Sequence, residues 1–175
     1  STSWYVDEKR RYRDPRLAPC DDLLAVARDE DVAQITTFAL DEEAAQLVAE
    51  QARARLGGTA PAVAHGAFDV GELRALAMRA AVYIGGDSGP LHIAATTETP
   101  VVALFGPTLP ERSMPWRDRR WFAEAIDAGP LPCRPCHQRE CAPGDFRCLT
   151  GIAVDRVIAA AERALEDRAH MKRRA

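Results

Sequence analysis

Residues 81–109 read AVYIGGDSGPLHIAATTETPVVALFGPTL, and this stretch is more informative than the rest of the chain. An apolar run at 81–84 ends in a glycine-rich turn, and a second apolar run at 101–105 ends in Gly-Pro-Thr. Between the two runs, residues 91–97 have the pattern of a short amphipathic helix. Strand, glycine turn, helix and strand in this order predict a βαβ unit with parallel strands.

The same alternation of elements continues on both sides of this unit. Asp69 and Glu72 have the spacing of a capping box, which predicts a helix through Arg79. Further strands are predicted at 32–40, 61–65 and 121–126, and further helices at 41–56 and 154–168. The predicted fold class is therefore α/β, a Rossmann-like parallel sheet with helices on both faces.

Composition narrows the classes of function. A chain of 175 residues with 47% hydrophobic residues is long enough to bury one substantial core. A net charge of −3 gives no bulk support for nucleic-acid binding. No apolar run approaches the length of a membrane span, and the charged amino terminus does not read as a signal peptide. We therefore expect a cytoplasmic protein with no transmembrane segment.

Polar residues gather where the first apolar run ends. Asp87, Ser88 and His92 follow it directly, and ligands of open α/β sheets bind outside the carboxyl ends of the strands. The order G-G-D-S-G-P-L-H matches neither the dinucleotide fingerprint nor a P-loop. A helix start at this place suits a phosphate group. The alternative readings are helix capping by Asp87 or Ser88, and a buried core position for His92.

The segment D-S-G-P-L-H-I-A-A, followed by T-P-V-V-A-L-F-G-P-T, resembles glycosyltransferase family 9, the heptosyltransferases of lipopolysaccharide core assembly. The resemblance implies one half of a GT-B fold, namely the half that binds the nucleotide-sugar donor. It places the donor pyrophosphate against residues of the turn: Gly86, Asp87, Ser88, Gly89, Leu91 and His92. It also implies a glutamate at the donor ribose, for which Glu42 or Glu43 is the equivalent. The alternative for these glutamates is a helix-dipole role.

The resemblance carries further expectations about the whole enzyme. It implies transfer of heptose from ADP-heptose to a lipopolysaccharide core acceptor, without a required cofactor, at the inner face of the inner membrane. It covers only the donor-binding half, so the catalytic residues stay unknown and the chain alone is expected to be inactive. The alternative is a non-catalytic nucleotide-sugar binding module or one subunit of a split transferase. We expect an atypical segment at 1–30, where Lys9 is a poor match to the family's lysine, and one domain at 31–170.

A cysteine-rich loop at 133–148 forms a second candidate site. Its four cysteines have the spacing C-x2-C-x4-C-x6-C and are Cys133, Cys136, Cys141 and Cys148. Four thiolates could hold a structural zinc or iron ion, and His137 could replace one of them. The alternative is a loop of free or paired thiols, since the spacing matches no standard zinc finger. Cys20 lies far from this cluster in the sequence.

Overall fold

The computed structural model describes residues 68–136 and 140–174, together with Gln46 and Glu50. Gln46 and Glu50 are helical, in agreement with the helix predicted at 41–56. The rest of what was predicted before residue 68 lies outside the described residues. This holds for the segment at 1–30, the strands at 32–40 and 61–65, and the side chains of Lys9, Cys20, Glu42 and Glu43. His137 also lies outside them.

The described part contains one parallel sheet. Its three strands are β1 (Tyr83–Gly86), β2 (Val101–Phe105) and β3 (Ala123–Asp127), in the order β1-β2-β3. Both strand pairs are parallel. The helices are α4 (Val70–Arg79), α5 (Gly89–Ala95), α6 (Pro110–Ser113), α7 (Arg147–Thr150) and α8 (Val154–Arg174).

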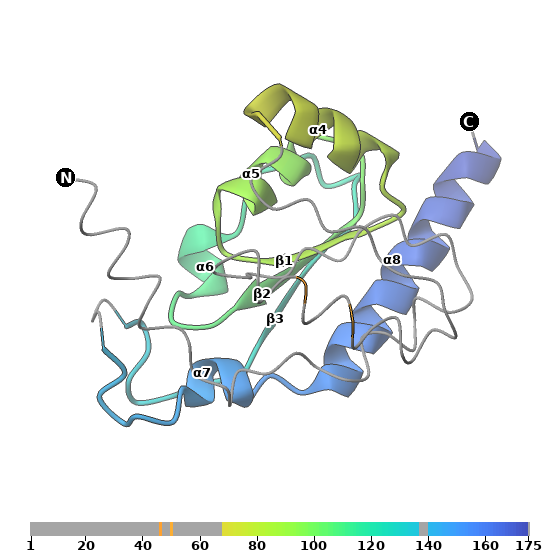
Figure 1. Ribbon diagram of the computed structural model, residues 1–175. Coiled ribbons are helices and arrows are strands. Elements are labelled where there is room, and N and C mark those ends of the chain that lie inside the picture. The colour runs from red at the N-terminus through yellow and green to blue at the C-terminus, as the bar shows by residue number, and fades with distance from the viewer. Residues whose placement is uncertain (1–45, 47–49, 51–67, 137–139, 175) are drawn as a thin grey trace.

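Helices cover both faces of the sheet (Figure 1). Because side chains alternate along a strand, each strand supplies residues to two cores. On one face, Tyr83, Val101 and Phe105 pack with Leu91 and other residues of α4 and α5. On the other face, strand residues such as Ile84, Val102 and Ile126 pack against the small apolar stripe of α8, Val157, Ala160, Ala161 and Ala164. The predicted Rossmann-like α/β class is confirmed.

Most predicted elements appear, with shifted ends. Strand β2 has the predicted bounds, and α4 begins after Asp69 with both capping-box bonds present. Strand β1 runs two residues later than predicted at each end, because pairing with β2 uses the backbone of Gly85 and Gly86 and needs no apolar side chain there. Helix α8 extends beyond 168, where its apolar stripe ends but the residues still favour helix.

Helix α5 also lies earlier in the chain than predicted. It spans 89–95 instead of 91–97, since Pro90 is well tolerated in a first helical turn. The hydroxyls of Thr96 and Thr97 donate to the carbonyls of Ile93 and Ala94, at 2.7 and 2.6 Å, where the helix ends. The predicted helix start at Leu91 is thus corrected to Gly89. This shift makes Ser88 the residue that directly precedes the helix.

Candidate functional site at the carboxyl edge of the sheet

Three turns meet where the strands end. Gly86 pairs with Leu104, and Phe105 pairs with Asp127, so the carboxyl ends of β1, β2 and β3 lie at one edge. The N–H of Asp87 donates to the Leu104 carbonyl at 3.2 Å and ties the first turn to β2. This edge is where ligands bind in open α/β sheets.

Ser88 precedes α5 in an extended conformation, with φ −162° and ψ 169°. Its side chain makes no capping bond to the helix. Its hydroxyl instead donates to the Gly86 carbonyl at 3.2 Å. Helix capping by the Ser88 side chain is therefore wrong as an alternative, because the hydroxyl points back along the turn.

Asp87 and His92 face each other across the turn. His92 Nε2 lies 3.7 Å from Asp87 Oδ1, and the exposed fractions of the two side chains are 53% and 19%. The alternative that placed His92 in the core is wrong, since more than half of its side chain is accessible. A histidine that is this accessible can meet both a ligand and the carboxylate of Asp87.

Gly89 and Leu91 have different surroundings. A Cβ added to Gly89 would meet nothing within 4 Å, so open space adjoins the first turn of α5. Leu91 is fully buried in the core formed with α4 and the sheet. Any contact of Leu91 with a ligand would therefore come from its backbone N–H. Gly86 is the last residue of strand β1.

Tyr83 adds a buried hydroxyl that the sequence analysis did not identify. The residue is 2% exposed, and its hydroxyl has no hydrogen-bond partner among the described residues. Burial raises the pKa of Tyr83 to about 12, and an interaction with Ser88 lowers it in part. The phenol thus lies near Ser88 without ideal hydrogen-bond geometry. A tyrosine in an apolar run gives no signal for such a role, because it fits the core equally well.

Arg134, which the sequence analysis also missed, braces the same edge. Its guanidinium pairs with Asp127 at 2.9 Å and donates to the carbonyls of Gly129 at 2.8 Å and Thr108 at 2.7 Å. The turns after β2 and β3 are thereby held together by one side chain. The sequence carries no signal for this role, because only the fold brings the carbonyls of Thr108 and Gly129 to Arg134.

The cysteine-rich loop attaches to this edge. The Cys136 N–H donates to the Pro107 carbonyl at 2.9 Å. All four loop cysteines are free thiols and are partly buried. Burial raises the pKa of the Cys148 thiol, and the nearby Cys141, Cys133 and Cys136 raise it further. The thiols are therefore close enough to influence each other, although no three potential ligands of the described part adopt a metal-binding arrangement.

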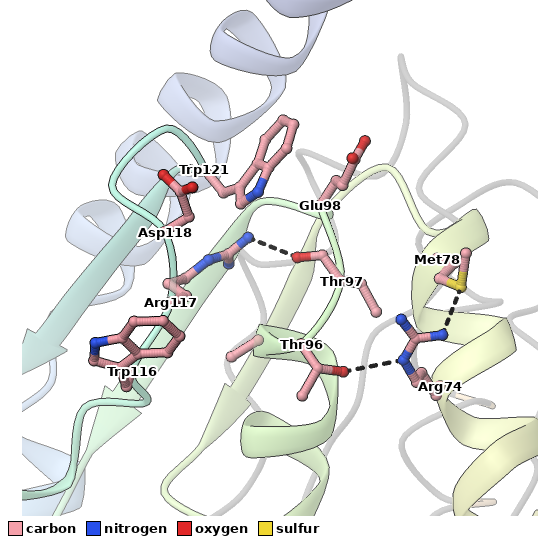
Figure 2. Close-up of a pocket in the computed structure, with 10 residues that line it drawn as sticks. Arg74, Met78, Thr96, Thr97, Glu98, Trp116, Arg117, Asp118 and Trp121 are labelled. Carbon is pink, nitrogen blue, oxygen red and sulfur yellow. Dashed lines mark hydrogen bonds between the residues drawn. The ribbon is translucent and has the colours of Figure 1, made fainter.

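A cavity of about 570 Å³ lies elsewhere, between helix α4, which contributes Arg74 and Met78, and residues from the end of α5 to the start of β3 (Figure 2). Arg117 donates there to the carbonyls of Thr97 and Thr99, at 3.0 and 3.1 Å, and Trp116 is 93% exposed. Thr99 and Pro100 come directly before β2, which begins at Val101, so this cavity is at the amino edge of the sheet. It is separate from the turn that carries Ser88.

A parallel α/β sheet with polar turns at its carboxyl edge defines a Rossmann-like domain. Residues 22–146 match the model of glycosyltransferase family 9 (heptosyltransferase). Because this match covers more than half of the chain, the chain belongs to glycosyltransferase family 9, as the sequence motifs predicted.

Individual relatives match over shorter segments. Lipooligosaccharide heptosyltransferase 2 of Campylobacter jejuni subsp. jejuni serotype O:2 is 31% identical over 86 residues, which are 49% of this chain and 26% of that protein. Lipopolysaccharide heptosyltransferase 3 of Escherichia coli (strain K12) is 37% identical over 96 residues, 55% of this chain and 26% of that protein. The matches thus span about a quarter of the length of these relatives.

A solved structure supports the fold. The crystal structure of a glycosyl transferase family 9 protein from Veillonella parvula superposes with a TM-score of 0.60 at 23% sequence identity. The superposition covers 94% of this chain and 52% of that chain. This agrees with one half of a GT-B fold. Among the described residues, no helix is long and apolar enough to cross a membrane.

Proposed function

We propose that the turn of residues 86–92 binds the diphosphate of a nucleotide-sugar donor, and that the chain is the donor-binding part of a heptosyltransferase. One observation carries the proposal: in a member of this family, Ser88, whose hydroxyl caps no helix, directly precedes Gly89, which adjoins open space at the carboxyl edge of the sheet. The names of the relatives favour heptose as the sugar and a lipopolysaccharide or lipooligosaccharide acceptor. We take ADP-heptose as the donor on the family resemblance.

The turn offers several donors of hydrogen bonds to a phosphate. The Ser88 hydroxyl holds only a long bond to the Gly86 carbonyl, 3.2 Å, and can rotate toward a ligand. The first helical bond of α5 runs from the His92 N–H to the Ser88 carbonyl, so the N–H groups of Gly89 and Leu91 have no partner within the helix. Pro90 has no N–H to contribute.

Asp87 needs a different role, because a carboxylate repels a phosphate. Its oxygen lies 3.7 Å from His92 Nε2, so a protonated His92 would offset its charge. We propose that Asp87 orients His92 or accepts a hydrogen bond from a sugar hydroxyl. His92, with its accessible ring, then contacts the phosphate or holds the turn.

In the proposed reaction, an acceptor hydroxyl oxygen bonds to the sugar's anomeric carbon and gives its proton to a base, while the bond from that carbon to the phosphate oxygen breaks. Negative charge then grows on the leaving diphosphate. Hydrogen-bond donors that are already aimed at that charge stabilise the transition state. Ser88 and the backbone of the turn supply such donors without a bound metal ion. The base that activates the acceptor is not assigned to a residue of this chain.

Titration calorimetry with ADP-heptose, ADP, UDP and GDP tests the proposal. We expect the two adenine compounds to bind best. Loss of a hydrogen bond to a charged group predicts that Ser88→Ala weakens binding by roughly 10- to 100-fold. Gly89→Leu should also weaken binding, because the added side chain occupies the open space without a clash inside the protein.

Trp116→Ala is the matched control. This side chain lines the separate cavity and is 93% exposed, so its removal should leave the fold intact. We expect unchanged affinity for ADP in this variant. Unchanged affinity in Ser88→Ala and Gly89→Leu, or a loss confined to Trp116→Ala, would overturn the assignment to the turn.

A further inference from the structure

Tyr83 and Gly85 lie on the same side of strand β1, because side chains two residues apart face the same way. A Cβ added to Gly85 would come within 2.6 Å of the Tyr83 hydroxyl oxygen. The phenol therefore lies along the strand in the space that Gly85 leaves free. This orientation brings the hydroxyl toward the carboxyl end of the strand, where Ser88 follows.

The hydroxyl of Tyr83 is an unusual feature of this core. The ring packs with Leu91, Val101 and Phe105, and for that purpose a phenylalanine would serve equally well. The hydroxyl is buried and has no partner among the described residues at hydrogen-bond geometry. A buried polar group without a hydrogen-bond partner is costly. We therefore expect the Tyr83 hydroxyl to form a hydrogen bond in another state of the site.

Ser88 is the group that can become this partner. A serine hydroxyl donates one hydrogen bond and accepts two. Its proton is directed at the Gly86 carbonyl, which leaves the lone pairs of Oγ free to accept. With a pKa of about 12, the Tyr83 phenol keeps its proton at neutral pH and can donate it.

We propose that Tyr83 is a positioning residue for Ser88 and donates a hydrogen bond to Ser88 Oγ when a diphosphate occupies the turn. The Ser88 O–H then turns from the Gly86 carbonyl to a phosphate oxygen. The donation from Tyr83 holds Oγ in place and polarises its O–H, since hydrogen bonds in a chain strengthen one another. The inference rests on the proposed donor site and adds a residue to it.

A double-mutant cycle on the 175-residue chain tests this role, with ADP as the probe. The four proteins are the unaltered chain, Tyr83→Phe, Ser88→Ala and the double variant. Loss of one neutral hydrogen bond predicts about three- to tenfold weaker binding for Tyr83→Phe. Because Tyr83 acts through Ser88, the double variant should bind as Ser88→Ala does. Thermal unfolding of Tyr83→Phe should occur at the same temperature or a higher one, since the ring and its packing remain and only a buried hydroxyl without a partner among the described residues is lost.

The outcomes separate this inference from the proposed function. If Tyr83→Phe binds ADP as tightly as the unaltered chain, or loses the same factor with and without Ser88, the role of Tyr83 is overturned while the donor site stands. A merely structural role would give that second pattern, because it does not need Ser88. If the unaltered chain fails to bind ADP, or Ser88→Ala has no effect, the donor site itself is overturned and Tyr83 loses its role with it.

Discussion

The guanidinium of Arg134 lies 2.9 Å from the carboxylate of Asp127, and the exposed fractions of the two side chains are 2% and 25%. The pair joins the cysteine-rich loop to the end of β3, and Arg134 reaches further to the Thr108 carbonyl after β2. Removing one partner of a buried ion pair leaves the charge of the other partner unpaired, which destabilises the folded state. The stability of the carboxyl edge therefore depends on this contact.

Arg134→Ala should lower the free energy of unfolding by about 2–3 kcal/mol. We place the loss below that of a fully buried pair because a quarter of the Asp127 side chain stays in contact with water. Urea denaturation measures the change. Arg120→Ala is the control, since Arg120 pairs with Asp118 at a similar distance, 2.8 Å, but on the surface. Equal, small losses in both variants would contradict the importance of the buried pair.

The Asp127 pair should also make stability depend on pH. Desolvation opposes ionisation of Asp127, but bonds from Arg134 and the Gly129 N–H outweigh it, so the pKa lies below its ordinary value of 3.8. A carboxyl whose pKa is lowered in the folded state stabilises the protein at pH values above the ordinary pKa of that carboxyl. This stabilisation is lost as the pH falls through the lowered pKa.

Asp127→Asn isolates this contribution from those of other carboxylates. The unaltered chain should be more stable than the variant at neutral pH, and the difference should shrink as the pH falls below 3.8. Urea denaturation at a series of pH values gives the curve. Asp118 and Asp145, whose pKa values are also lowered by arginines, remain in both proteins and cancel. A difference that stays constant with pH would contradict the assignment.

Gly106 has no room for a larger side chain unless the Leu149 side chain moves. A Cβ at Gly106, directly after β2, would collide with the Leu149 side chain of α7. Overpacking of this kind predicts that Gly106→Ala costs about 1–3 kcal/mol in unfolding free energy. Gly106→Ala should cost less when it is made in the Leu149→Ala variant than in the unaltered chain, because the atoms that collide are then absent. Gly89→Ala, which meets nothing within 4 Å, is the matched control and should not lower stability.

The sequence predicted the βαβ unit well because its signals are local. The apolar run of β2 and the capping box at Asp69 depend only on neighbouring residues, and both were confirmed. The end of β1 was predicted too early because Gly85 joins the sheet through its backbone. Arg134 and the Tyr83 hydroxyl could not be predicted, since their roles depend on the carbonyls and hydroxyls that the fold brings to them.

The four cysteines of the loop should share one fate, either as one metal site or as two pairs, with Cys20 apart. Burial raises the pKa of the Cys148 thiol, and the other three cysteines raise it further, because neighbouring thiolates repel one another. A bound metal ion would remove this repulsion, since it takes thiolates as ligands. Elemental analysis of protein purified without added metal is the direct test, with about one zinc or iron per chain expected for a tetrahedral site. Cys148→Ser should then release the metal, and Cys20→Ser should retain it. Protein without metal, in which all four loop thiols titrate freely in the folded state, would contradict the prediction.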